Sequence, residues 1–184
     1  MNTVVEVRPQ ASRVATEPVQ YLTFMLAGET FAIGILAIKE IIEYSQLTEV
    51  PMMPASVRGV INLRGAVVPV MDLLARFGRL PSTVTKRTCI VIIELESSGE
   101  RQIVGVVVDA VNEVLDIAPA DIEPPPVFGA HIRTDFIQGM GKVKGKFVIL
   151  LNVEQVLSLD EIGSSGDGDA AAKPKACPEP LAAP

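Results

Sequence analysis

Few side chains in this sequence could act as nucleophiles or general bases. There is one histidine, His131, and there are two cysteines, Cys89 and Cys177. Cys89 lies inside an apolar run and Cys177 in a segment rich in proline and alanine, so nothing places either thiol beside the imidazole. Serine catalysis would also depend on His131, and no Gly-x-Ser-x-Gly elbow precedes it. We therefore interpret His131 as a surface-loop residue rather than a catalytic base.

The sequence indicates neither a metal site nor a phosphate site. Beyond the single histidine and the separated cysteines, only carboxylates could bind a metal, and they occur singly along strands and turns. The run from Gly139 to Lys146 resembles a phosphate loop, but Phe147 follows where Ser or Thr is required. We interpret this run as a glycine-bearing β-turn, and we predict no cofactor and no metal.

Charged residues set among aliphatic ones are typical of a binding surface. Glu40 interrupts an aliphatic run that extends from Ile35 to Ile42, and Arg64 stands at the tip of a predicted hairpin, just before Gly65. Such charges either mark a solvated outward face or belong to a groove that binds a helix. In such a groove, aliphatic side chains give affinity and a few charges fix the register.

A loop with two neighbouring methionines is a second candidate contact. Met52 and Met53 lie between Pro51 and Pro54. Methionine adapts its shape to varied partners, so the pair could contact another protein, but it could equally pack beneath its own loop.

The composition excludes several classes of protein. The 184 residues carry 16 Lys and Arg against 22 Asp and Glu, and a net charge of −6 disfavours nucleic acid and anionic membranes as partners. The longest apolar runs, 103–108 and 147–151, are far shorter than the roughly 20 residues of a transmembrane helix. No export signal is visible, and cysteines in such different surroundings argue against a disulfide. We therefore expect a reducing cytoplasmic location, with Cys89 as a small buried hydrophobic residue.

The elements that must position these residues are mainly β-strands. Short segments rich in Val and Ile are separated by Gly or Pro, as in small barrels or sandwiches. Asp72 is placed to cap a helical turn through Phe77, and Asn152 to cap a helix over 153–159. The predicted strands cover residues 21–26, 31–35, 59–63, 67–71, 89–95, 103–108, 111–117 and 146–151.

The sequence predicts one folded core with a tail on each side. Residues 1–17 lack periodicity, and residues 163–184 are almost entirely small, charged or proline. We expect both tails to be disordered and residues 18–162 to form the domain.

The second half of this core repeats the first. Gly59–Asp72 aligns without a gap on Gly139–Asn152, and both copies keep two glycines, a basic residue before the second glycine, an apolar strand and a helix cap. Residues 38–42 match 111–115 in the same way. Tandem duplication of one β unit is the simplest interpretation. Each unit alone is too small for a stable core, so we expect the two to share one, with a groove at their seam.

At this point the residues resemble a known family, the CheW coupling proteins of bacterial chemotaxis. The similarity covers about residues 18–162. Its most specific part is Gly-Val-Ile-Asn-Leu-Arg-Gly-Ala-Val-Val-Pro-Val at 59–70, and the run Val-Gly-Val-Val-Val-Asp at 104–109 follows in the matching order. The segments 21–26 and 31–41 complete the pattern.

The resemblance implies a mostly β fold. It consists of two tandem, intertwined SH3-like five-stranded barrels on a shared core, with short helices that include one near the C-terminus. It implies a non-catalytic cytoplasmic scaffold recruited to membrane-bound receptor arrays. Its partners would be the cytoplasmic signalling domain of a chemoreceptor and the regulatory domain of a CheA-type histidine kinase.

The resemblance also implies roles for individual residues. By position, the receptor-binding residues would be Ile35, Ile38, Glu40 and Arg64, and the glycines required by the backbone would be Gly59, Gly65 and Gly105. Cys89 with its neighbours and the residues near Gly139 fall where the family binds its kinase, without an assignment of single contacts.

Other interpretations remain open at this stage. The length leaves no room for an ATP-binding or receiver domain, so we expect a stand-alone coupling protein rather than part of CheA or CheV. A paralogue that serves a twitching, biofilm or developmental pathway is one alternative. A small β-barrel enzyme or ligand-binding domain with an unrecognised pocket is the other.

Overall fold

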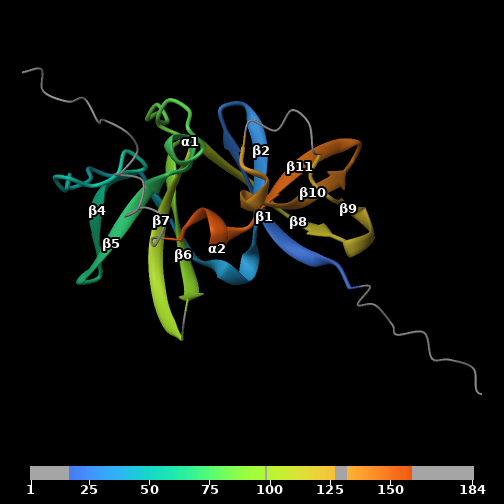
Figure 1. The fold of residues 1–184 in the computed structure, drawn as a ribbon, viewed down its shortest axis with the longest axis horizontal. Coiled ribbons are helices and arrows are strands. Elements are labelled where there is room, and N and C mark those ends of the chain that lie inside the picture. Colours follow the sequence, from blue (N-terminus) through green and yellow to red (C-terminus); the bar gives the residue numbers. More distant parts are fainter. Residues whose placement is uncertain (1–16, 98, 127–131, 159–184) are drawn as a thin grey trace, which may run out of the picture.

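The computed structural model describes residues 17–97, 99–126 and 132–158, which form two β-sheets joined by short helices (Figure 1). Residues 1–16 of the predicted N-terminal tail, the whole predicted C-terminal tail and His131 lie outside the described residues. Among the residues that are described, no helix is long and apolar enough to span a membrane.

Strands dominate the described chain, as predicted. In order, its elements are β1 (Val19–Leu26), β2 (Glu29–Gly34), the 3-10 helix η1 (Ile35–Ala37), β3 (Ile38–Glu43), β4 (Val57–Leu63), β5 (Ala66–Asp72), α1 (Leu73–Arg76), β6 (Cys89–Ser97), β7 (Glu100–Val108), β8 (Ala110–Ile117), η2 (Pro119–Asp121), β9 (Ile122–Glu123), η3 (Thr134–Phe136), β10 (Ile137–Val143), β11 (Lys146–Leu151) and α2 (Val153–Val156).

The two sheets share one strand order. In the middle sheet the order is β3-β6-β7-β5-β4, and in the terminal sheet it is β8-β1-β2-β11-β10, with the two-residue strand β9 added at the edge. In each sheet one parallel pair, β5 with β7 or β11 with β2, joins two antiparallel sets. The prediction of two similar β units is confirmed, and the added β9 makes the terminal sheet six-stranded instead of five-stranded.

The halves of the sequence exchange strands between the sheets. The terminal sheet takes the β1–β2 hairpin from the first half and β8 to β11 from the second, while the middle sheet takes β3, β4 and β5 from the first half and the β6–β7 hairpin from the second. Figure 1 shows the middle sheet on one side, the terminal sheet on the other and α2 between them. The two units are therefore intertwined.

A shared core lies between the sheets. Its largest cluster draws buried residues from both sheets and both α-helices, including Phe24 and Phe31 of the terminal sheet and Val91 and Val106 of the middle sheet. The rings of Phe24, Phe31, Phe77 and Phe136 form a continuous row, with centroid separations of 6.3, 5.9 and 6.1 Å. Each sheet also has a smaller core of its own. Because the central cluster belongs to both units, either unit alone would lose this cluster and keep only its smaller core.

Short helices begin where the sequence predicts caps. The Asp72 carboxylate accepts from the backbone N–H of Leu74 and Ala75, and the Asn152 side chain accepts from that of Gln155. The second helix ends at Val156, three residues before the predicted end, because the backbone of Leu157 leaves the helical conformation.

Candidate functional site

Two of the four residues expected to face the receptor are in direct contact. The Arg64 guanidinium donates to Oε2 of Glu40 across 3.0 Å. Glu40 lies in β3 and Arg64 in the turn between β4 and β5, which the barrel-like curvature of the middle sheet brings together although both strands are at its edges. The Arg64 side chain is 78% exposed and that of Glu40 only 22%. Arg64 therefore covers the carboxylate from the solvent side.

The Glu40 carboxylate keeps an unused acceptor. Its Oε1 atom is buried and has no hydrogen-bond partner among the described residues. A buried acceptor without a partner is costly, so a donor that reached it would bind with a favourable exchange of contacts.

The two isoleucines extend this site along the chain. Ile38 and Glu40 are both half-buried, but a register shift between them pairs Ile38 with Ile93 and Glu40 with Ile92 of β6, so their side chains lie on opposite faces of the sheet. Ile35 is the first residue of η1, directly before β3, and both isoleucines pack against the central core. The β3 surface, as we call it, comprises Ile35, Leu36, Ile38, Glu40 and Arg64.

Leu36 was not among the residues expected from the sequence. It is 96% exposed in η1, between the half-buried Ile35 and Ala37. With Ile35 it lines a depression of about 380 Å³, which Leu151 and Val153 also line. A leucine that is exposed to solvent beside an apolar depression is a candidate anchor for a partner protein. The sequence signal was only its place inside the aliphatic run from Ile35 to Ile42.

The turn that carries Arg64 is tightly specified. Arg64 and Gly65 have φ angles of 53° and 88°, and the Asn62 side chain accepts from the Gly65 N–H at 2.8 Å. Two successive left-handed residues make the turn type that closes two-residue hairpins, and glycine adopts this conformation without strain. Asn62 and Gly65 thus fix the position from which Arg64 reaches Glu40.

The other two glycines permit close approach of neighbouring chain. A Cβ atom on Gly59 would lie 2.5 Å from the carbonyl oxygen of Thr48, and one on Gly105 would lie 2.9 Å from a methyl group of Ile90. Thr48 pairs with Val60 across this approach, through backbone hydrogen bonds of 2.9 and 3.0 Å. A side chain at residue 59 would displace this connection beside β4.

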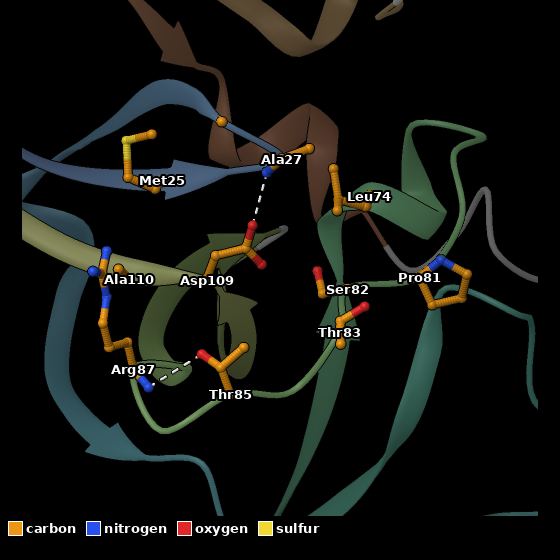
Figure 2. A pocket seen from close by; sticks show the side chains of 11 residues that line it. Met25, Ala27, Leu74, Pro81, Ser82, Thr83, Thr85, Arg87, Asp109 and Ala110 are labelled. Carbon is orange, nitrogen blue, oxygen red and sulfur yellow. Dashed lines mark hydrogen bonds between the residues drawn. The ribbon is translucent and has the colours of Figure 1, made fainter.

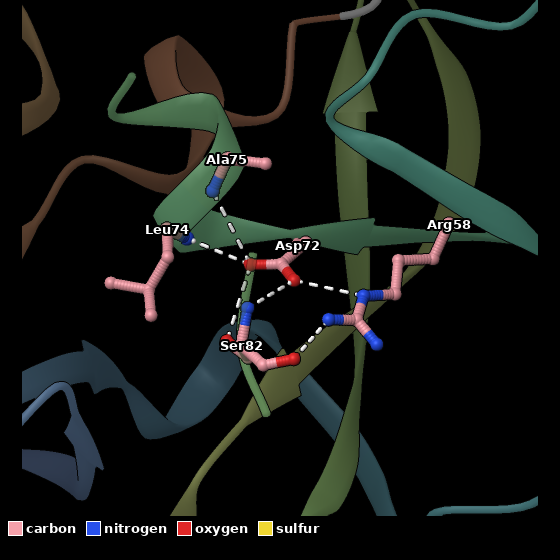
Figure 3. Close-up of polar contacts among 5 residues, drawn as sticks. All are labelled: Arg58, Asp72, Leu74, Ala75 and Ser82. Atoms are coloured by element: carbon pink, nitrogen blue, oxygen red, sulfur yellow. Dashed lines mark hydrogen bonds and ion pairs between the residues drawn. The ribbon is translucent and has the colours of Figure 1, made fainter. Parts of the chain in front are cut away.

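A buried carboxylate holds the loop that follows α1 (Figure 3). Asp72 is fully buried and accepts from Nε of Arg58 at 2.9 Å, from Leu74 and Ala75 N–H, and from both the N–H and the hydroxyl of Ser82. Arg58 also donates to the Ser82 carbonyl oxygen. Partial burial acts to lower the pKa of Arg58, but hydrogen bonding with Tyr44 and the Asp72 charge raise it above its usual value.

A surface cavity adjoins this loop and carries no catalytic arrangement among the described residues. It has a volume of about 640 Å³, and Met25, Leu74, Thr85, Arg87 and Asp109 are among its lining residues (Figure 2). The Asp109 carboxylate accepts from the Ala27 N–H at 2.7 Å, which gives it a structural role. No group of three or more metal-ligating side chains occurs within the part of the chain that the structure describes.

The expected kinase-side residues lie in different sheets. Cys89 starts β6 of the middle sheet and Gly139 lies in β10 of the terminal sheet. Cys89 is a free thiol that packs against the central core, but it is half-buried rather than buried as expected.

The two loop methionines differ in exposure. Met52 is fully exposed with a left-handed backbone, φ 62°, whereas Met53 is 42% exposed. Met52 therefore does not pack beneath its own loop, which leaves it available for contact.

Comparison with known proteins identifies the family. The family model described as the CheW-like domain matches residues 20–161. The chain belongs to the CheW-like family. This assignment bears out the resemblance that the residues at 59–70 and 104–109 indicated.

Named relatives cover nearly the same span. The chain is 34% identical over 153 residues to the chemotaxis protein CheW of Klebsiella aerogenes, which covers 82% of this chain and 90% of that protein. It is 32% identical over 142 residues to the chemotaxis protein CheW of Rhizobium meliloti, covering 77% and 89%. The solved structure of the scaffolding protein TtCheW from Thermoanaerobacter tengcongensis matches with a TM-score of 0.68 and 32% identity, over 84% of this chain and 93% of that one. TtCheW is described as a scaffolding protein, and the CheW-like family is one of non-catalytic scaffolds.

Proposed function

We propose that this chain is a chemotaxis coupling protein. It would act as a cytoplasmic scaffold that binds the signalling tip of a chemoreceptor and the regulatory domain of a CheA-type histidine kinase, and that is thereby recruited to receptor arrays. The names of its relatives, chemotaxis protein CheW and a scaffolding protein, support this role.

The observation that carries the receptor side is the β3 surface. It combines an exposed leucine, half-buried isoleucines and one ion pair that is open to solvent on the Arg64 side. Helical partners are commonly bound in this way, because apolar anchors supply affinity and a few charges set the register. The receptor tip is an expected partner of this chemistry.

The kinase side rests on less detailed support. The half-buried Cys89 at the start of β6 and the residues around Gly139 in β10 are the expected contacts. Cys89 belongs to the middle sheet and Gly139 to the terminal sheet.

Control of the kinase requires contacts that differ between two receptor states. A scaffold that bound both states equally could not transmit a signal. A coupling free energy of about 1–3 kcal/mol corresponds to a change in binding affinity of about 5- to 150-fold between the two states.

Titration of the full chain with each partner tests the proposal. A receptor cytoplasmic fragment and the regulatory domain of a CheA-type kinase are titrated separately, by calorimetry. Binding of both is the expected result. If neither partner binds, the scaffold proposal fails although the fold assignment stands, and binding of a small metabolite instead would favour the ligand-binding alternative.

A further inference from the structure

The loop between α1 and β6 presents a preformed surface that the proposed function leaves unused. Ser82, near its centre, is buried and held by the Asp72 carboxylate through two hydrogen bonds, of 2.8 and 3.2 Å. On either side of this anchor Leu80 is 87% exposed and Val84 is 45% exposed. We define the loop surface as Leu80, Val84, Lys86 and Arg87.

The loop surface borders the cavity of about 640 Å³. Met25, Leu74 and Pro81 supply apolar wall, and Arg87 lines the cavity beside Thr85 (Figure 2). An aliphatic side chain could therefore enter next to a guanidinium group.

The chain segment that carries the loop surface has a charge opposite to that of the whole protein. Residues 73–93 contain four basic residues and no acidic one, in a chain of net charge −6. Arg79 pairs with Glu29 at 3.3 Å, but Lys86 and Arg87 are exposed and form no ion pair with any described residue. The nearest acidic lining group, Asp109, already accepts a hydrogen bond from Ala27. The surface thus fits an acidic segment that also carries aliphatic side chains.

The chain itself supplies a segment of this chemistry. Residues 159–169, Leu-Asp-Glu-Ile-Gly-Ser-Ser-Gly-Asp-Gly-Asp, contain four carboxylates and no basic residue, with aliphatic side chains at 159 and 162. The segment follows α2, and the Val156 carbonyl oxygen of α2 accepts from Nε of Arg76 at 3.0 Å. Arg76 ends α1, the helix whose Leu74 lines the cavity. Eleven residues can span up to about 36 Å, so the loop surface is within reach.

We propose that residues 159–169 bind the loop surface of their own chain. An aliphatic side chain of the segment occupies the cavity mouth, and its carboxylates lie beside Lys86 and Arg87. Covalent linkage raises the effective concentration of such a segment into the millimolar range, so weak contacts suffice. Salt weakens the association because the charges are exposed.

The bound segment would lie close to Cys89, two residues after Arg87. Cys89 has an expected kinase role only under the proposed function. The binding itself does not depend on that role and is tested without any partner.

Paramagnetic relaxation in the full-length protein provides the test. A nitroxide label is attached at Ser164→Cys in a chain in which Cys89→Ala and Cys177→Ala leave no other thiol. The proposal predicts loss of amide signal for residues 83–87 and for Gly28 in the oxidised state, with recovery after the nitroxide is reduced. Signal loss elsewhere, or nowhere, would overturn it.

Charge variants distinguish specific binding of residues 159–169 to the loop surface from random contact between the two. Neutralising the segment by D160N/E161Q/D167N/D169N, or reversing the surface by K86E/R87E, should restore the signals, as should 0.5 M NaCl. Two matched controls should leave the signal loss unchanged: K173Q/K175Q alters charge beyond the segment, and K142E/K144E makes the same reversal on the β10–β11 hairpin of the other sheet. Signal loss that persists in the neutralised segment, or that disappears in both controls, would refute the proposal.

Discussion

Arg64 and Glu40 meet across 3.0 Å although 24 positions separate them in the sequence. The equivalent basic residue in the repeated hairpin, Lys144, has nearly the same backbone, φ 50° against 53°, but forms no ion pair with a described residue. The duplicated hairpin is therefore conserved in shape, while only the copy in the middle sheet carries a neutralised cation. This difference makes Lys144 a natural control for Arg64.

Reversing the charge of Arg64 should weaken receptor binding without unfolding the protein. In Arg64→Glu two carboxylates face each other, and we expect affinity for a receptor fragment to fall at least tenfold, about 1.4 kcal/mol. The free energy of unfolding should change by no more than about 1 kcal/mol because the Arg64 side chain, where the charge is reversed, is 78% exposed. Calorimetric titration and urea unfolding measure the two effects.

Two further variants decide between a structural and a contact role. Lys144→Glu should bind the receptor as the unaltered chain does. The swap Glu40→Arg with Arg64→Glu restores an ion pair of opposite direction, and it should recover stability but not affinity. Full recovery of affinity in the swap would mean that the pair only shapes the hairpin.

Leu36→Ser should weaken receptor binding and leave the stability of the fold unchanged. Leu36 is 96% exposed, so its removal leaves no cavity, and the melting temperature should stay within about 2 °C of the original value. Receptor affinity should fall about tenfold or more as the apolar anchor is lost. Leu80→Ser, at an 87% exposed leucine on the loop after α1, is the matched control. Equal loss in both variants would argue against a specific anchor.

Asp72→Ala should strongly destabilise the fold. The substitution strands the Arg58 guanidinium and the N–H groups of Leu74, Ala75 and Ser82, and breaking such a pair costs about 3–5 kcal/mol. Asn152→Ala removes only the corresponding cap and should cost about 1 kcal/mol. Urea unfolding of the two variants, with midpoints compared at the same dependence of the unfolding free energy on urea, measures both effects. Similar midpoint shifts in the two variants would show that Arg58 and Ser82 add little to the Asp72 network.

Gly59→Ala should also destabilise the fold, because its added Cβ atom would collide with neighbouring backbone. Its Cβ would lie 2.5 Å from the Thr48 carbonyl oxygen, in a backbone with φ 153°, so the Thr48–Val60 pairing must yield at a cost of about 1–3 kcal/mol. Gly34→Ala meets open space at an ordinary φ and should be close to neutral. Differential scanning calorimetry of the two variants tests this, and unchanged unfolding of Gly59→Ala would contradict the geometry.

Local sequence patterns predicted much of the fold. The Arg64-Gly65 and Lys144-Gly145 turns, the caps at Asp72 and Asn152, and most of the long strands are where composition and spacing placed them. These features depend on a few neighbouring residues, so the sequence carries them directly.

Three described strands escaped prediction: the two-residue strand β9, and β3 and β10, whose patterns are weak. β3 contains Lys39, Glu40 and Glu43 within six residues, and β10 contains two glycines and Gln138. The exchange of strands between the sheets is not a local property either. The repeat shows that two units exist, but which hairpin pairs with which partner is decided by packing in the shared core.

The site could be predicted only in part. The resemblance named Glu40 and Arg64, but neither spacing nor composition could show that they form an ion pair, because that contact depends on the curvature of the middle sheet. Leu36 was missed since exposure cannot be read from an aliphatic run.

The central claim is that this chain couples a receptor to a kinase, and kinase autophosphorylation tests it most directly. A CheA-type kinase is assayed with a receptor cytoplasmic fragment, with and without the full chain, and with Arg64→Glu and Lys144→Glu as the paired variants. We predict that the unaltered chain and Lys144→Glu raise phosphorylation only when the receptor is present, and that Arg64→Glu does so much less. Phosphorylation that stays the same with and without the chain would contradict the coupling role.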